Sequence, residues 1–222
     1  LFFVESRTIP MVNIGIDFPG GFAHDPKDRI GVSNFTAHLM NKGSKIKGVV
    51  KDEAYIADSI SDLGSMISFA AGKELTSIRI KTLSTSEVLD PLVDQASDMI
   101  AFPVFNSKIL EREKSIQISG LLESETKPEY ILSKQFKKMI YRDNPLGNDQ
   151  TVNSTKAIRL EDLKNFHQRF YRAGKMNVLI IGDVSREKAI EIATKLTSKI
   201  PSAPDTGLDI PLSLIHISEP TR

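Results

Sequence analysis

The residues that come nearest to a catalytic pattern lie between positions 31 and 44, in the stretch GVSNFTAHLMNKGS. Its frame is that of a helix carrying His-x-x-Glu-His, in which two histidines four residues apart share a zinc ion and the glutamate serves as general base for a bound water. The three chemical positions here read Asn34, Ala37 and His38. One imidazole therefore remains, an amide stands for the other, and a methyl group stands for the base.

The remaining histidines and carboxylates do not suggest a second metal site. His24 is expected in an exposed loop, and His167 on the surface of an amphipathic helix. A single histidine carries no spacing information, so His38 itself is expected to be a packed or hydrogen-bonded helix residue. A charge-rich helix is typical of a solvated face, and this applies to Glu111, Glu113, Glu123 and Glu125.

Composition excludes several classes of partner. The 222 residues include 29 basic and 28 acidic side chains, a net charge of +1, so no strong field favours nucleic acid or an anionic membrane. The basic stretch at 134–142 lacks the interleaved aromatic platforms of a nucleic-acid interface. Cysteine is absent, which excludes a disulfide framework and a thiolate metal site. No apolar run approaches the ~20 residues that span a bilayer.

The apolar pattern predicts the elements that must position the motif helix. Alternation predicts strands at 11–18, 66–71 and 75–83, and a continuous apolar run predicts a buried central strand at 176–181. Helical spacing, caps and breaker residues predict helices near 31–40, 51–63, 84–100, 108–125, 128–141, 160–171 and after 185. Strands at both ends with helices between them indicate an α+β domain with one mostly antiparallel sheet and helices packed on it.

Both ends of the sequence differ from an ordinary domain. The chain opens at Leu1 in β-rich residues without an initiator Met, so the domain, placed at residues 1–200, is expected to be truncated at its start. Residues 201–211 have the composition of an interdomain linker. Residues 212–222 resemble translated adapter sequence, and this expected non-native tail, with His216, is excluded from the functional interpretation.

The order of these signals resembles the pitrilysin/insulinase family of zinc metallopeptidases, in particular its processing-peptidase members. Each matching piece is weak alone, but their order and spacing over residues 1–211 are specific. The pieces are Ile9-Pro10, Gly20-Gly21-Phe22, the 31–44 motif, Leu63-Gly64, Phe102-Pro103-Val104-Phe105, residues 110–114, Asn144-Pro145-Leu146-Gly147 and residues 177–184. The resemblance implies a metallopeptidase-like, inverzincin domain.

The resemblance also implies where a third zinc ligand should stand. The family carries a glutamate seven residues beyond the position of Glu113, and here that position is Gly120. With Asn34, Ala37 and Gly120, three of the four chemical positions have lost their function. A catalytic zinc of this class needs three protein ligands and an open position for water. We therefore expect neither zinc nor any other cofactor in this chain, and no peptidase activity of the chain by itself.

The function implied by the resemblance is that of a degenerate subunit. Such a subunit binds a peptide or an unfolded protein and completes a proteolytic chamber as a heterodimer with a zinc-bearing homologue. The compartment implied is the periplasm or, alternatively, the mitochondrion. Other interpretations are a structural, core-type subunit of a larger complex and an active zinc endopeptidase with atypical ligands.

Peptide binding in this interpretation occurs by strand addition to a sheet edge. The expected edge is the strand 75–83, with Thr76, Ile78 and Ile80 as peptide-binding residues. The alternating Arg79 and Lys81 have a second explanation, because charged side chains also protect an exposed edge against aggregation.

Overall fold

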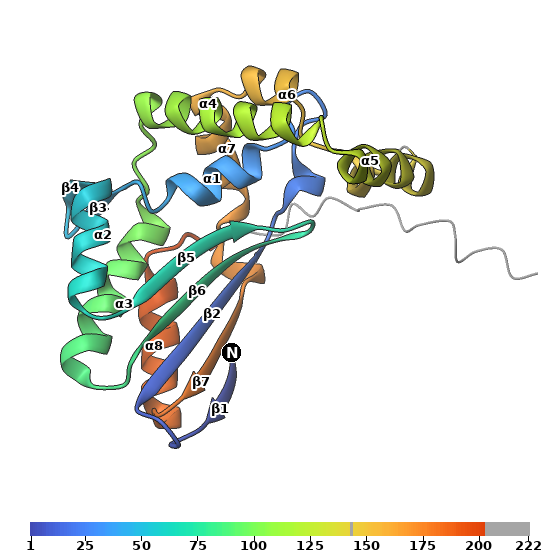
Figure 1. Cartoon of the computed structure of the whole chain (residues 1–222). Helices are drawn as coiled ribbons and strands as arrows, with labels where there is room; N and C mark the ends of the chain where they lie inside the picture. The colour runs from blue at the N-terminus through green and yellow to red at the C-terminus, as the bar shows by residue number, and fades with distance from the viewer. Residues whose placement is uncertain (143, 203–222) are drawn as a thin grey trace, which may run out of the picture.

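The computed structural model describes residues 1–142 and 144–202, and the expectations for the linker and tail beyond 202 lie outside this range. Five strands form the main sheet in the order β1-β7-β2-β6-β5 (Figure 1). Their bounds are Phe2–Glu5 for β1, Met11–Pro19 for β2, Met66–Ala71 for β5, Leu75–Leu83 for β6 and Asn177–Gly182 for β7. The parallel β1–β7 pair is joined to antiparallel pairs, which confirms the predicted mostly antiparallel α+β sheet.

The sheet register explains why the alternating sequence pattern folds in this way. Ile14 of β2 lies between Ile80 of β6 and Ile180 of β7, so three branched apolar side chains form a row on one face. All three are buried in the main core. Because successive residues of a strand point to opposite faces, the polar alternates on β2 and β6 lie on the other face.

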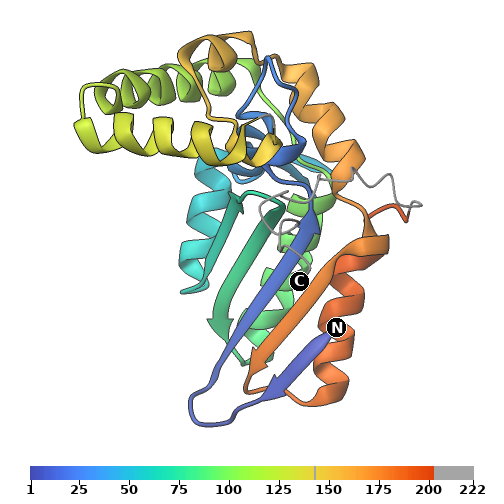
Figure 2. The same ribbon diagram turned by 90° about the vertical axis from the view of Figure 1, so that its right-hand side faces the viewer.

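One face of the sheet is covered by helices and the other is open. Helices α3 (Ser86–Ala101) and α8 (Arg186–Ser198) pack together against the covered face (Figures 1 and 2). β7 is an interior strand, as expected, but the prediction of two-sided burial is wrong. Leu179 and Ile181 are exposed on the open face, because no element of the described chain covers that side.

A second group of helices lies across one end of the sheet and holds the motif helix (Figure 1). It contains α1 (Val32–Leu39), α4 (Ser107–Ser124), α6 (Val152–Ala157) and α7 (Leu160–Phe170). α2 (Glu53–Asp62) follows the small antiparallel hairpin of β3 (Gly43–Ile46) and β4 (Val49–Asp52). The sequence pattern predicted neither this hairpin nor α6. Short 3-10 turns are η1 (Phe22–His24), η2 (Pro145–Gly147) and η3 (Ala173–Lys175).

Helix α5 (Pro128–Tyr141) projects from the body of the domain (Figures 1 and 2). It has no buried residue, and its main neighbour is η2. Among the helices of the described residues, none has both the length and the apolar character that a membrane crossing requires.

Candidate functional site

The motif helix α1 begins at a glycine that is held by a buried carboxylate. Gly31 is the N-cap, with a φ of 116° that side chains rarely tolerate. Asp25 Oδ2 accepts a hydrogen bond from the Gly31 amide at 2.7 Å, and its Oδ1 accepts one from the Ser33 amide at 2.9 Å. Asp25 thus satisfies two of the amides that a helix start leaves without partners. Burial raises the pKa of Asp25 to about 6, against the lowering effect of these donors.

A second contact fixes Gly31 from the other side of the chain. The amide of Gln150 packs so closely that a Cβ added to Gly31 would lie 2.4 Å from Gln150 Nε2. Gln150 accepts a hydrogen bond from Gln117 of α4 at 3.4 Å and donates one to Thr155 of α6 at 3.0 Å. The start of α1 is therefore positioned jointly by α4 and α6.

The three motif positions differ strongly in environment. Asn34 is exposed, and Ala37 is completely buried in the core. His38 is partly exposed and, being four residues after Asn34, lies on the same face of α1. Asn34 and His38 thus retain the one-turn spacing of a ligand pair, whereas Ala37 offers a buried methyl group and no acceptor for a proton.

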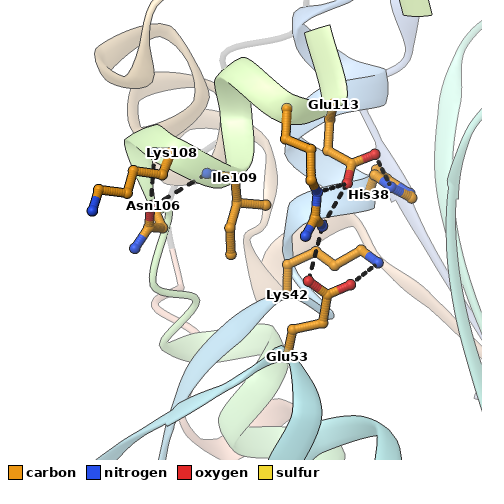
Figure 3. Close-up of polar contacts among 8 residues, drawn as sticks. His38, Lys42, Glu53, Asn106, Lys108, Ile109 and Glu113 are labelled. Carbon is orange, nitrogen blue, oxygen red and sulfur yellow. Dashed lines mark hydrogen bonds and ion pairs between the residues drawn. The ribbon is translucent and has the colours of Figure 1, made fainter. Parts of the chain in front are cut away.

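His38 is held by an ion-pair network that joins α1, α2 and α4 (Figure 3). Its Nε2 lies 3.0 Å from Glu113 Oε2. The other oxygen of Glu113 accepts from Arg112 Nη2 at 2.7 Å, and Arg112 Nη2 also donates to Glu53 at 2.8 Å. Glu53 in turn accepts from Lys42 Nζ at 2.5 Å. His38 is therefore a hydrogen-bonded helix residue, and Glu113, expected on a solvated face, is mostly buried under this network.

The network keeps its carboxylates ionised. Burial raises the pKa of Glu113, but the hydrogen bond from Arg112 and the neighbouring His38 outweigh it, and the pKa lies below its usual value. The hydrogen bonds from Lys42 and then Arg112 lower the pKa of Glu53. The carboxylates of Glu113 and Glu53 alternate with the cations of Arg112 and Lys42. Each charge of the network therefore has a partner of opposite sign.

The position expected to carry a third zinc ligand has space but no ligand. Gly120 lies in α4, two helical turns beyond Glu113, and is exposed. A Cβ added to Gly120 would meet nothing within 4 Å. Across the described residues, no three His, Cys, Asp or Glu side chains are grouped so that they could hold a metal ion. The donor set of Asn34, His38 and Gly120 does not fit a zinc site, since it supplies one imidazole.

The structure corrects the strand proposed for peptide addition. β6 is paired with β2 on one side and β5 on the other, so it has no free edge. Thr76, Ile78 and Ile80 are fully buried beneath the helices and cannot contact a peptide. Arg79 and Lys81 alternate with the buried residues of β6. They lie on the open face of an interior strand and do not mark an edge.

The edge strands of the main sheet are β1 and β5, and β5 is the one beside β6. Its burial alternates between exposed and half-buried along Met66–Ala71. Gly72 N donates to Leu75 O at 2.8 Å in the turn that follows, which makes this a hydrogen-bonded pair. In an antiparallel ladder such pairs alternate with unpaired ones, so the amides of Ile67, Phe69 and Ala71 point to the free edge. α1 packs beside β5, so this edge runs next to the motif helix.

The other histidines are less exposed than the sequence suggested. His24 is half-buried, accepts from the Gly21 amide at 3.3 Å and packs edge-on against Phe170. His167 stacks on Tyr171, with ring centroids 4.7 Å apart, and its Nε2 lies 2.8 Å from the carbonyl oxygen of Ile100. Burial lowers the pKa of His167. The prediction of a surface histidine is wrong because the helical pattern does not show that Ile100, at the end of α3, and Phe105 contact this side of α7.

Two family models match the sequence. One, described as insulinase (peptidase family M16), matches residues 2–153. The other, described as the peptidase M16 inactive domain, matches residues 157–221. A non-peptidase homolog, YmxG of Helicobacter pylori, is 24% identical over 84% of this chain and 42% of that protein. A probable mitochondrial-processing peptidase subunit beta of Arabidopsis thaliana is 26% identical over 87% of this chain and 36% of that protein.

Solved structures share the fold. A peptidase M16 inactive domain from Pseudomonas fluorescens has a TM-score of 0.86 at 27% identity, covering 93% of this chain and 49% of that one. The periplasmic protease PqqL from Escherichia coli has a TM-score of 0.76 at 15% identity, covering 92% of this chain and 24% of that one. The chain spans half or less of the length of the curated relatives it matches.

Proposed function

The chain belongs to the insulinase family, peptidase family M16, and from this premise we propose that it is a non-cleaving subunit that binds extended peptide and completes a proteolytic chamber with a zinc-bearing homologue. The observation that carries the proposal is the donor set. α1 and α4 keep the family frame, but they present Asn34, Ala37 and Gly120 at three of the four chemical positions.

The binding part of the proposal rests on the edge of β5. An extended peptide can pair with the outward amides and carbonyl groups of Ile67, Phe69 and Ala71 without displacing any strand of the sheet. Backbone pairing gives affinity with little sequence preference, which suits an unfolded protein or a peptide substrate. Because α1 lies beside β5, the bound peptide runs past the degenerate motif. The catalytic zinc is then supplied by the partner.

The names of the relatives support a partner and a compartment for this proposal. The processing-peptidase relative is named as a subunit, which supports a paired assembly for this chain. Relatives with mitochondrial and periplasmic names support either of those compartments, and we favour the periplasm.

Strand addition can be tested with a proline at the edge. Ala71→Pro removes an outward amide, and Ala71→Val is the matched control that keeps it. Fluorescein-labelled, reduced and carboxymethylated α-lactalbumin serves as the unfolded probe, with binding read by fluorescence anisotropy. We expect Ala71→Pro to weaken binding at least about tenfold, equivalent to ~1.4 kcal/mol, and Ala71→Val to leave it unchanged. Equal binding by the two variants would contradict β5 as the peptide site.

The chamber is tested by reconstitution. The homologue with an intact His-x-x-Glu-His motif from the same genome is mixed with this chain, and cleavage of a fluorogenic peptide is measured. We expect cleavage only from the mixture. Cleavage by the chelator-treated chain alone would contradict the proposal, and co-purification with membrane redox subunits instead of that homologue would favour the structural, core-type role.

A further inference from the structure

A cavity of about 630 Å³ opens between α4, the end of α6 and the start of α7. The motif positions Asn34, Ala37 and His38 do not line it. Charged side chains dominate its walls, with four basic residues against two acidic ones. They are Arg29, Lys114, Lys156 and Arg159, and Asp28 and Glu111. α4 and α6 contact each other here (Figure 1), so the cavity is a basic hollow in an ordered framework, separate from the motif.

Two of the four cations already have carboxylate partners. Arg29 Nη1 donates to Asp162 at 2.5 Å, and its Nε lies 3.4 Å from the carboxylate of Asp28. Lys114 Nζ lies 3.0 Å from Glu111, whose side chain is mostly exposed. These pairs use every carboxylate that lines the cavity. The positive charge of the other two cations is therefore not neutralised by the walls.

The two remaining cations are Lys156 and Arg159, which take part in no ion pair of the residues that the structure describes. The backbone that carries them is held in place by a buried ammonium group. Lys114 Nζ donates to Lys156 O at 3.1 Å and to Ile158 O at 3.0 Å. Arg159 N in turn donates to Asp162 at 2.8 Å. Both free cations are therefore attached to a fixed turn between α6 and α7, which favours binding of an anion with little loss of entropy.

We propose that this cavity binds a small ligand through a phosphate monoester. Such a group carries a charge of about −1.5 to −2 at pH 7 and three acceptor oxygens, which matches one guanidinium and one ammonium. A single carboxylate carries one negative charge and would leave one of the two cations without a partner. No aromatic residue is among those that line the cavity, so there is no platform on which a nucleobase could stack. The volume beyond the phosphate therefore suits a polar body such as a sugar.

Isothermal titration of the full chain with glucose 6-phosphate, in a buffer without phosphate, tests the site. We expect a Kd on the order of 1 mM or tighter. Lys156→Gln and Arg159→Gln should each raise the Kd at least about fivefold. Arg186→Gln is the matched control, because Arg186 is an exposed residue of α8 that does not line the cavity. Lys156 and Arg159 are also exposed, so circular dichroism should be the same for all these variants.

Lysine acetylation, mapped by mass spectrometry, locates the ligand independently of its affinity. Glucose 6-phosphate at about ten times its Kd should slow the acetylation of Lys156 at least about fivefold, because it occupies most of the sites. Lys45 of β3 is the control, since it is also exposed and does not line the cavity. Its rate of acetylation should not change.

The source of the phosphate group is decided by a second probe. Phosphatidylcholine vesicles that contain phosphatidic acid present the same group on a lipid. Binding of glucose 6-phosphate would identify a soluble ligand, whereas binding of these vesicles alone, lost in Arg159→Gln, would identify a lipid head group, and either result supports the phosphate site. The proposal would be overturned if neither probe bound, if the Lys156→Gln/Arg159→Gln double variant bound as well as the natural chain, or if hexaglutamate bound equally well.

Discussion

The imidazole of His38 and the carboxylate of Glu113 are in hydrogen-bond contact, 3.0 Å apart from Nε2 to Oε2. The contact joins the motif helix to α4, the helix on which the resemblance predicts a third zinc ligand. The His38 imidazole is therefore part of an ion-pair network within the chain (Figure 3), which continues through Arg112, Glu53 and Lys42.

The purified chain should not retain stoichiometric zinc. His38 is the only imidazole among the motif positions, and neither an exposed amide nor a glycine replaces the missing ligands. Metal analysis after dialysis measures this directly, with His38→Ala as the matched control. About one zinc per chain, lost on His38→Ala, would contradict the loss of the site.

Restoring the site should need all three substitutions together. Asn34→His, Ala37→Glu and Gly120→Glu in one chain should rebuild zinc binding, whereas Ala37→Glu alone should give no peptidase activity because there is no metal-bound water to activate. Isothermal titration with zinc separates these cases. If Ala37→Glu alone cleaved a peptide, the assignment of the motif would be wrong.

The single substitutions at positions 37 and 120 should differ in stability. Ala37 is completely buried, so Ala37→Glu places a carboxylate in the core and should cost at least ~2 kcal/mol of unfolding free energy. Gly120→Glu enters open space and replaces a glycine inside a helix, so it should stabilise by up to ~1 kcal/mol. Urea unfolding of both variants provides the measurement, and a reversed order would show that the environments are misassigned.

Breaking the contact between α1 and α4 should lower the free energy of unfolding only slightly. Glu113→Gln keeps the shape of the side chain and removes its charge, and half-exposed partners such as His38 and Arg112 limit the loss to ~0.5–1 kcal/mol. Chemical unfolding in low and high salt measures it, since a charge effect should shrink with salt. A salt-independent loss would assign the contribution to packing.

Removing the N-terminal cap of the motif helix should lower the free energy of unfolding more than Glu113→Gln does. Asp25→Ala leaves the amides of Gly31 and Ser33 without their acceptor in a buried place, and we expect a loss of ~2–3 kcal/mol. Asp28→Ala, in the exposed part of the same loop, is the control and should be near neutral. Thermal unfolding of the two variants compares them at one pH.

The same carboxylate should make stability depend on pH. The pKa of Asp25 is about 6 in the fold and 3.8 in the unfolded chain, so the folded state binds the proton more tightly between these values. The contribution of protonated Asp25 to the free energy of unfolding is therefore fully present below pH ~4. It is lost as the pH rises to ~6, and the loss amounts to up to ~3 kcal/mol. Urea midpoints at pH 4–7 for the natural chain and Asp25→Asn test the sign, because the variant should lack this dependence.

Much of the sheet follows from local pattern. The bounds of β5 and β6 coincide with the predicted strands, since alternation and the turn at Gly72 are local signals. Strand order depends on contacts between segments that are far apart in the sequence. The prediction of β6 as an edge strand was wrong for this reason, because β2 and β5 pair with its two sides. Sequence spacing predicted that Asn34 and His38 share one face of α1, but it did not indicate the acceptors that contact this helix, such as Asp25 and Glu113, which come from separate segments.

The position of β2 has a consequence for how the protein is made. One side of β2 pairs with β6, but the other pairs with β7, where Asn13 meets Ile181 near the end of the described chain. A ribosome therefore has to synthesise almost the whole domain before the central strand loses its bare edge. Until then the nascent chain exposes a strand able to pair with another copy, so strand order alone makes the incomplete domain prone to association during translation.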